Sequence, residues 1–160
     1  MMRARVRRIF VVLVGLSSAL CAGAGVAVAS SGTEELVIRG AGGEHRFEVE
    51  IADNEKARAQ GLMYRTTLAS DKGMIFLLAH NRRVAMWMKN TPLSLDMIFI
   101  DASGRIAAIV DRTTPNSTDL IASPGPVRAV LEIRGGEAAR RGLAPGDCVH
   151  FREFSCGALP

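Results

Sequence analysis

The sequence lacks the short motifs by which several large enzyme classes are recognised. It holds no P-loop, no GxGxxG fingerprint, no HExxH zinc motif, no CxxC pair and no GxSxG nucleophile elbow. These absences exclude the common phosphate-binding loops, the helical zinc-protease site and the serine-hydrolase elbow. The sequence therefore assigns no reaction, and whether the protein is an enzyme stays open at this stage.

The chain also has no excess of either charge beyond position 29. Four arginines lie ahead of the first acidic residue, Glu34, so the remainder holds 20 − 4 = 16 basic side chains against 16 acidic ones. A formally neutral domain does not fit a protein that binds nucleic acid through phosphate contacts, so we expect no nucleic-acid partner. Apolar residues make up 48% of the chain and charged residues 22%, which excludes wholesale disorder.

The N-terminal segment, residues 1–29, has the order of a secretory signal peptide. An arginine-rich start is followed by an apolar run, and small residues then lead to Ala27-Val28-Ala29, an AxA cleavage pattern. We therefore expect a single domain over residues 30–160 in a periplasmic or secreted protein. The alternative is an uncleaved inner-membrane anchor through residues 9–28, which is long enough to span a bilayer. Only that segment would then contact the membrane.

Cleavage of the signal peptide removes Cys21 and leaves two cysteines, Cys148 and Cys156. Exported proteins fold in an oxidising compartment, and the seven residues between these cysteines allow the chain to reverse direction. We expect a disulfide between them, which closes a short loop and stabilises the domain by about 2–3 kcal/mol.

The pattern of residues 30–160 predicts a mostly β fold (α+β, with two short helices). Short runs of alternating apolar and polar residues are typical of strands, and seven to eight short strands indicate a compact β-barrel or β-sandwich. We expect strands at 35–38, 45–51, 73–78, 84–88, 95–100, 105–110, 127–133 and 148–151. The helices are expected at 54–60, capped by Asp53 and ended by Gly61, and at 137–141, with a loop over 111–126.

Four sequence blocks follow one another along this domain. They are Gly61-Leu62-Met63-Tyr64-Arg65; Gly73-Met74-Ile75-Phe76; Trp87-Met88-Lys89-Asn90-Thr91 with Leu95-Asp96-Met97-Ile98-Phe99; and Val130-Leu131-Glu132 ahead of Gly146-Asp147. Together they resemble a bacterial and archaeal family known as domain of unknown function 192, over about residues 49–151. The resemblance implies a small β-rich domain that is commonly exported, and it implies no reaction, cofactor or catalytic residue. The family often has an aromatic residue just before the tryptophan, where this chain has Met86.

The segment around the single tryptophan is the strongest candidate for a binding site. Lys89, Asn90 and Thr91 offer polar groups for the mouth of a pocket, and Trp87 offers an apolar platform beside them. The expected ligand-binding set is Arg65, Trp87, Lys89, Asn90, Thr91 and Asp96. We therefore expect a binding or accessory module for a small polar ligand or an envelope component.

Alternation places Asp96 on the apolar face of its strand, where a carboxylate needs a partner. Arg58 and Arg65 are candidates for this partner, and so are backbone N–H groups. The alternative is an acid–base role in a hydrolase-like enzyme, in which Asp96 acts with Arg65 or His150. Another acidic residue, Glu132, lies off the apolar face of its own strand, where solvent exposure is the simplest interpretation. A two-carboxylate glycosidase site with Asp96 is the alternative, for which the sequence gives no separation.

Two methionines that flank the tryptophan give a further alternative. Met86 and Met88 share one face of an expected strand, and thioethers in such positions normally fill gaps in a core. With a histidine such as His80 nearby, they would suit copper as Cu(I), which prefers sulfur ligands. Further candidate ligands are His45, Met63 and Met74. Apart from this copper alternative, we expect no cofactor.

Overall fold

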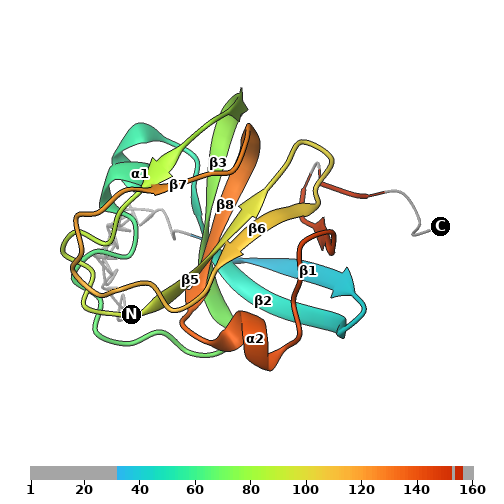
Figure 1. The fold of residues 1–160 in the computed structure, drawn as a ribbon, viewed down its shortest axis with the longest axis horizontal. Coiled ribbons are helices and arrows are strands. Elements are labelled where there is room, and N and C mark those ends of the chain that lie inside the picture. The colour runs from blue at the N-terminus through green and yellow to red at the C-terminus, as the bar shows by residue number, and fades with distance from the viewer. Residues whose placement is uncertain (1–31, 153, 157–160) are drawn as a thin grey trace, which may run out of the picture.

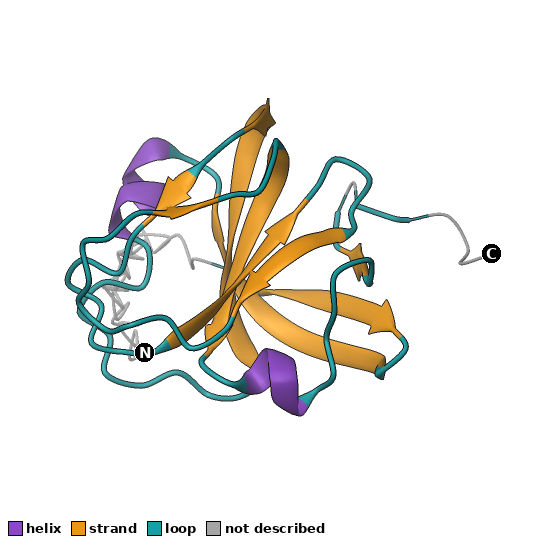
Figure 2. Cartoon of the chain, viewed as in Figure 1, coloured by secondary structure: helices purple, strands orange, loops and turns teal. Residues whose placement is uncertain are grey.

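The computed structural model describes residues 32–152 and 154–156, and the predicted signal peptide lies outside these residues. The described chain forms the strands β1 (Glu34–Gly40), β2 (Gly43–Ala52), β3 (Lys72–Arg82), β4 (Ala85–Met86), β5 (Leu95–Ile100), β6 (Ile106–Val110), β7 (Ile121–Ala122), β8 (Val127–Arg134) and β9 (Cys148–His150), and the helices α1 (Glu55–Gln60) and α2 (Glu137–Arg140). Strands dominate and the two helices are short (Figure 2), which confirms the predicted fold class. In this part of the chain, no helix is both long and apolar enough to cross a bilayer.

Seven of these strands form one curled sheet, with the order β6-β5-β8-β3-β2-β1-β9 (Figure 1). The neighbours β2 and β3 are parallel, and the other neighbours in this sheet are antiparallel. The central strands β5, β8 and β3 therefore each have a strand on both sides. β4 and β7 form a separate two-stranded sheet.

Both faces of the curled sheet are apolar because both are covered. The inner face draws buried residues from all seven strands, among them Ile98 and Leu131, and Ala138 of α2 packs against them. The outer face carries a second buried cluster that includes Met97 and Val130. α1, β4 and β7 cover this outer face through Ala57, Met86 and Ile121. A functional group on the outer face is therefore enclosed between the sheet and this second layer.

The two edges of the curled sheet meet near the C-terminus of the described chain. Arg105, just before β6, forms an isolated bridge with Cys148 of β9, and the Val149 N–H donates to the Gly104 carbonyl at 2.8 Å. Cys148 forms a disulfide with Cys156, and their Cα atoms lie 5.8 Å apart, within the usual range. The structure therefore contains the cysteine pair that the sequence predicts.

Three local expectations were wrong. Asn54, and not Asp53, caps α1, because the Asn54 side chain accepts a hydrogen bond from the Ala57 N–H at 2.9 Å. The expected loop over 111–126 contains β7, and the expected strand over 84–88 shortens to β4, its partner. Each of these two short strands is defined by a partner that is distant in the sequence, which local alternation does not reveal.

Candidate functional site

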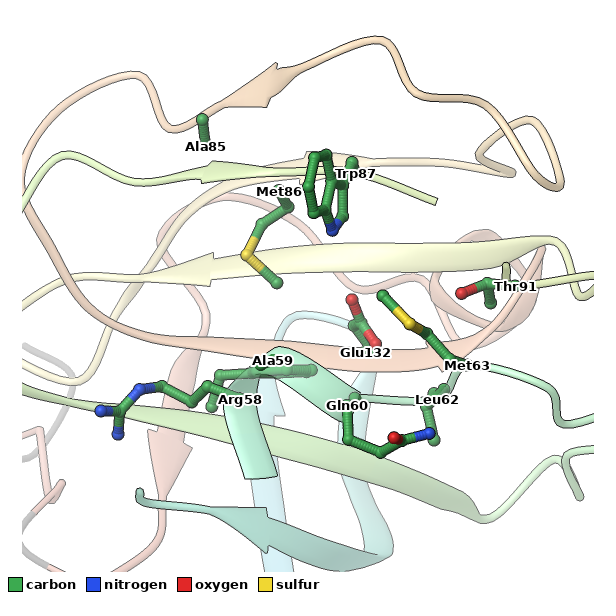
Figure 3. Close-up of a pocket in the computed structure, with 12 residues that line it drawn as sticks. Arg58, Ala59, Gln60, Leu62, Met63, Ala85, Met86, Trp87, Thr91 and Glu132 are labelled. Atoms are coloured by element: carbon green, nitrogen blue, oxygen red, sulfur yellow. The ribbon is translucent and has the colours of Figure 1, made fainter. Parts of the chain in front are cut away.

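A cavity of about 220 Å³ lies between α1, β4 and the outer face of the sheet. We call it the Glu132 cavity, because the Glu132 carboxyl of β8 lies at its floor (Figure 3). It is lined by Arg58, Ala59, Gln60, Gly61, Leu62, Met63, Phe76, Ala85, Met86, Trp87, Thr91 and Glu132. α1 and β4 thus leave a space above β8, and this space is the Glu132 cavity.

The Glu132 side chain is buried, and its carboxyl has no hydrogen-bond or ion-pair partner among the described residues. Only 5% of its surface is exposed, and its neighbours across the sheet are Met74 of β3 and Met97 of β5. Within the described chain, no group forms a hydrogen bond or ion pair with it, and the guanidinium of Arg58 extends away from it (Figure 3) to donate to the Leu77 carbonyl. Burial alone raises the pKa of Glu132 to about 8, so the carboxyl is mostly protonated at neutral pH.

The sequence-based expectation that Glu132 faces solvent was therefore wrong. Alternation along β8 separates Leu131 from Glu132 correctly, but the face of Glu132 is covered by α1 and β4. The neighbouring strand β5 held the signal that could have revealed this cover. Leu95, Met97 and Phe99 make the outer face of β5 apolar, and such a face needs a second layer over it.

The chain's only tryptophan lines this cavity, and its only tyrosine is next to a lining residue in the sequence. Trp87 is 48% exposed and lines the cavity, while Tyr64 is 70% exposed and follows the lining residue Met63. The Asn90 amide donates to the Tyr64 hydroxyl at 2.9 Å, and the Tyr64 N–H donates to the Asn90 carbonyl at 2.7 Å. Both aromatic side chains have a polar handle, as is common for residues in contact with ligands or partners.

The residues that adjoin Met63 and Thr91 in the sequence contain backbone strain. Tyr64 has a φ of 64° and Asn90 a φ of 55°, so two neighbouring non-glycine residues adopt the left-handed conformation. For a bulky residue such as Tyr64 this conformation costs about 1 kcal/mol or more, and the reciprocal bonds with Asn90 hold it in place. Such strain is frequent at functional sites.

Two more predicted residues, Lys89 and Thr91, follow Trp87 closely in the sequence. The Lys89 ammonium lies 5.4 Å from the centre of the Trp87 ring, a cation–π contact. Thr91 is buried in the wall, and its hydroxyl donates to the Lys89 carbonyl at 3.2 Å. The Glu132 cavity thus combines thioether, aliphatic and aromatic walls with a few polar groups, the usual composition of a small-molecule site.

Two of the six predicted ligand-binding residues, Trp87 and Thr91, line the Glu132 cavity, and Lys89 and Asn90 lie between them in the sequence without lining it. Arg65 lies outside the Glu132 cavity. Its guanidinium pairs with the Glu50 carboxylate, which raises the pKa of Arg65, and both residues line a neighbouring cavity of about 430 Å³. The two cavities share Gln60 and Gly61 at the end of α1.

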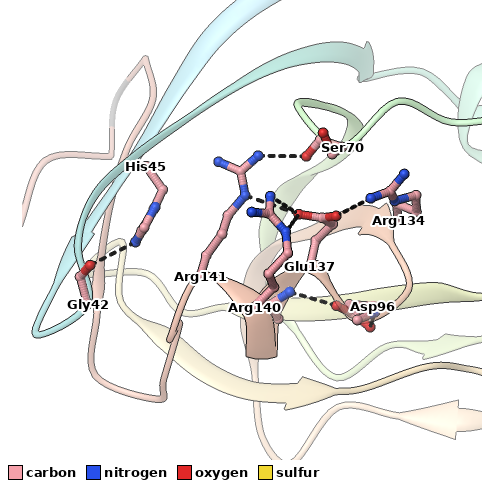
Figure 4. A network of polar contacts seen from close by, with 10 residues as sticks. Gly42, His45, Ser70, Asp96, Arg134, Glu137, Arg140 and Arg141 are labelled. Carbon is pink, nitrogen blue, oxygen red and sulfur yellow. Dashed lines mark hydrogen bonds and ion pairs between the residues drawn. The ribbon is translucent and has the colours of Figure 1, made fainter.

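Asp96 lies on the opposite, inner face of the sheet and holds the chain around α2 (Figure 4). Its carboxylate is fully buried and accepts from the backbone N–H groups of Arg112, Gly136 and Ala138, each at 2.8 Å. Of the partners that the sequence left open, the backbone N–H groups are the ones present, and neither Arg58 nor Arg65 is among its hydrogen-bond partners in the described structure. Neither Arg65 nor His150 is among the hydrogen-bond partners of Asp96 in the described structure.

A second buried carboxylate, Glu137, secures the same helix. Arg134, Arg140 and Arg141 surround it (Figure 4), and the hydrogen bonds from Arg140 and Arg134 lower the pKa of Glu137 to about 2. Arg141 also lies over the Phe47 ring at 4.3 Å. These ion pairs connect the carboxylate of α2 to arginines just before and after it in the sequence.

The structure separates the methionines that were candidates for copper. Met88 is buried in the outer cluster, and its sulfur accepts a hydrogen bond from the Thr113 hydroxyl at 3.2 Å. Met86 lines the Glu132 cavity, and so does Met63, whereas His80 is exposed on β3. Among the described residues, no three His, Cys, Asp or Glu side chains form a group that could hold a metal ion.

The described residues form a small, mostly β protein with one curled sheet and a cavity on its outer face. The chain belongs to the family DUF192, described as "Uncharacterized ACR, COG1430", which it matches over residues 37–151. This confirms the resemblance noted from the sequence.

Two solved structures are similar to this chain. A protein of unknown function from Novosphingobium aromaticivorans DSM 12444 is 39% identical, with a TM-score of 0.73 over 74% of this chain and 85% of that one. A protein from Sinorhizobium meliloti 1021, described as a candidate transcription regulator, is 43% identical, with a TM-score of 0.73 over 76% of this chain and 95% of that one. No curated protein matches the sequence.

Proposed function

We propose that the protein is an exported binding module that holds a small polar ligand in the Glu132 cavity. One observation carries the proposal. The Glu132 carboxyl is buried without a partner in the described chain, at the floor of a cavity whose mouth holds the only tryptophan.

The proposal follows from the cost of such a carboxyl. A polar group that loses water without gaining a hydrogen bond destabilises a protein by about 1–3 kcal/mol. Among the described residues, no side-chain oxygen is both fully buried and unpaired, so the Glu132 carboxyl, which has no partner there, opens onto the cavity. A carboxyl whose polar atoms open only onto a cavity supports a functional role, here the recognition of a polar group that the ligand supplies.

The size of the cavity limits the ligand. Its volume of about 220 Å³ is about seven times the volume that one water molecule occupies in the liquid. Sites for drug-sized molecules start at about 300 Å³. The Glu132 cavity therefore suits a ligand of monosaccharide size, or one terminal group of a larger molecule whose remainder contacts Trp87 and Tyr64 at the rim.

Export is supported by the sequence of the N-terminal segment, residues 1–29, and by the cysteine pair. An arginine-rich start, an apolar run and an AxA pattern are typical of a cleaved signal peptide. A disulfide between Cys148 and Cys156 fits a protein that works in an oxidising compartment.

A role in DNA binding, suggested only by the description of the Sinorhizobium protein, has less support in this chain. The 16 basic and 16 acidic side chains beyond position 29 balance each other. Binding through phosphate contacts needs a surplus of basic groups.

Native mass spectrometry of the protein purified from its own cell envelope tests these points together. We expect a chain that starts at Ser30, is two hydrogens lighter than the reduced form and carries a small ligand. A chain that retains residues 1–29 contradicts cleavage. A bare chain that also takes up nothing from an envelope extract contradicts the binding function.

A pair of variants then tests whether the ligand occupies the Glu132 cavity. Trp87→Ala removes an exposed residue of the cavity mouth, so binding should be lost while the circular dichroism spectrum stays that of the folded protein. Leu120→Ala is the matched control, because Leu120 is 69% exposed but does not line the cavity. Equal loss of binding in both variants would exclude this cavity as the site.

One observation favours a second candidate function, binding of Cu(I). The Met63 and Met86 side chains both line the Glu132 cavity, and Figure 3 shows them directed towards the space above the Glu132 carboxyl. Thioethers select Cu(I) over harder ions. The double variant Met63→Leu with Met86→Leu should abolish Cu(I) uptake, and unchanged uptake would exclude this function.

A further inference from the structure

We infer that the ligand of the Glu132 cavity is uncharged and presents a hydrogen-bond donor and an acceptor side by side, as a primary amide or two neighbouring sugar hydroxyls do, and that Glu132 binds it as the protonated acid. This inference rests on the proposed function of the cavity and adds the chemical class of the ligand.

The first argument is that the polar groups directed into the cavity have no charge. The Glu132 carboxyl is mostly protonated at neutral pH, since burial raises its pKa to about 8. The Thr91 hydroxyl donates its proton to the Lys89 carbonyl, which leaves its oxygen as an acceptor. Figure 3 shows the ring nitrogen of Trp87 on the cavity side, where its N–H is a neutral donor. An uncharged ligand matches all three groups.

The second argument concerns the charged groups nearest to Glu132. Lys89 lies over the Trp87 ring at the rim, and Arg58 lines the cavity while its guanidinium extends away from Glu132 to the Leu77 carbonyl. A cationic ligand would meet the Lys89 ammonium at the rim and would have to ionise a buried carboxyl. An anionic ligand would enter a cavity whose floor, among the described residues, has no cation to pair with it.

The strands beside Glu132 also contribute no charge that would change this balance. Across the outer face, the residues in register with Glu132 are Met74 on β3 and Met97 on β5. The next position, Glu50 on β2, lies two strand spacings away, about 10 Å, and is paired with Arg65. Glu132 is therefore the one titratable group among the described residues at the cavity floor.

The third argument is geometric. A protonated carboxyl places an O–H donor and a C=O acceptor next to each other, so its complement carries an acceptor and a donor with the same spacing. A primary amide pairs with it through two parallel hydrogen bonds, and neighbouring hydroxyls do so through their oxygen and hydrogen atoms. The apolar walls formed by Met63, Phe76 and Met86 accommodate the carbon skeleton of such a ligand.

Three probes of one shape test the inference: isobutyramide, isobutyrate and isobutyramidinium, which are neutral, anionic and cationic. D-glucose, a neutral probe with neighbouring hydroxyls, is the fourth. Binding is followed by the fluorescence of Trp87, the only tryptophan, at pH 6 and pH 9. We expect isobutyramide or glucose to bind best at pH 6 and about tenfold more weakly at pH 9, where roughly a tenth of Glu132 remains protonated.

Two variants of Glu132 provide the controls. Glu132→Gln retains a donor and an acceptor but does not titrate, so it should bind the neutral probe with equal affinity at both pH values. Glu132→Leu removes both groups and should not bind it. A neutral probe that binds the leucine variant as tightly as the wild type would overturn the inference.

The probes separate this inference from the proposed function. Isobutyramidinium that binds more tightly at pH 9 than at pH 6 would show that the cavity takes a cation, and isobutyrate that binds as tightly as isobutyramide would show that it takes an anion. Either result overturns the uncharged ligand and keeps the cavity as a binding site. If neither neutral probe binds at pH 6, the inference is also overturned, while the native mass spectrum decides the binding function independently.

Discussion

Replacing Glu132 by glutamine should stabilise the protein, and the gain should grow with pH. In the folded protein burial raises the pKa of Glu132 to about 8, while in the unfolded chain the carboxyl regains its ordinary value of 4.5. The unfolded state therefore releases the proton at a lower pH than the folded state. The contribution of Glu132 to the free energy of unfolding is therefore at its highest below pH 4.5 and falls as the pH rises towards 8. The glutamine variant does not titrate and escapes this loss.

The magnitude follows from the two pKa values. Each pH unit between 4.5 and 8 removes about 1.4 kcal/mol from the free energy of unfolding of the wild type. The advantage of Glu132→Gln should therefore grow by about 3 kcal/mol between pH 5 and pH 7, and by about 5 kcal/mol over the whole interval. Below pH 4.5 the two proteins should be similar, because both side chains are then neutral.

Urea unfolding at pH 4, 5, 6, 7, 8 and 9, with the disulfide intact, measures this difference. Glu55→Gln is the matched control, because Glu55 is an exposed carboxylate on α1. Its difference from the wild type should stay within about 0.5 kcal/mol across the series. Parallel stability curves for the wild type and Glu132→Gln would refute the reasoning, since they would show that burial does not perturb this carboxyl.

Three further predictions concern residues that hold the fold. Glu137→Gln should destabilise the protein by about 2 kcal/mol at pH 7, and the difference should shrink as the pH falls from 4.5 towards 2, because the pKa of Glu137 is lowered; urea unfolding at pH 3 and pH 7 measures it. Asp96→Asn directs an amide donor at backbone N–H donors and should cost about 3 kcal/mol in urea unfolding at pH 7; a cost under about 1 kcal/mol would contradict the role of Asp96 in holding α2. The double variant Cys148→Ser with Cys156→Ser should lose about 2 kcal/mol relative to the oxidised protein, and equal urea midpoints would contradict this.

Much of the fold could be predicted from the sequence, because alternation reports directly which face of a strand is buried. The run Phe47, Val49, Ile51 marked β2, and Asp96 was correctly placed on the face of Ile98. What alternation could not supply was long-range pairing. β4 and β7 are two residues each, and only their contact with one another distinguishes them from loops.

The candidate site was predicted in part, for a similar reason. Trp87 and Thr91 stood out because their residue types are unusual for a core, and they do line a cavity. Glu132 was missed because a charged residue opposite Leu131 is normally solvated, and the sequence does not say which strand face a distant helix covers. Asp96 was included because its burial was correctly foreseen, while its backbone partners come from segments that follow β6 and β8.

β9, the last strand in the sequence, pairs with β1, the first, so this pairing must wait until both strands are available. β1 lies between β2 and β9, and its register with β9 joins Val37 to His150. For a chain that crosses a membrane N-terminus first, one edge of β1 lacks its partner until almost the whole domain has emerged. During that interval the open edge can pair with another chain, so crowded translocation would favour aggregation of partly exported molecules. The Cys148–Cys156 disulfide begins in β9, the strand that closes this edge of β1.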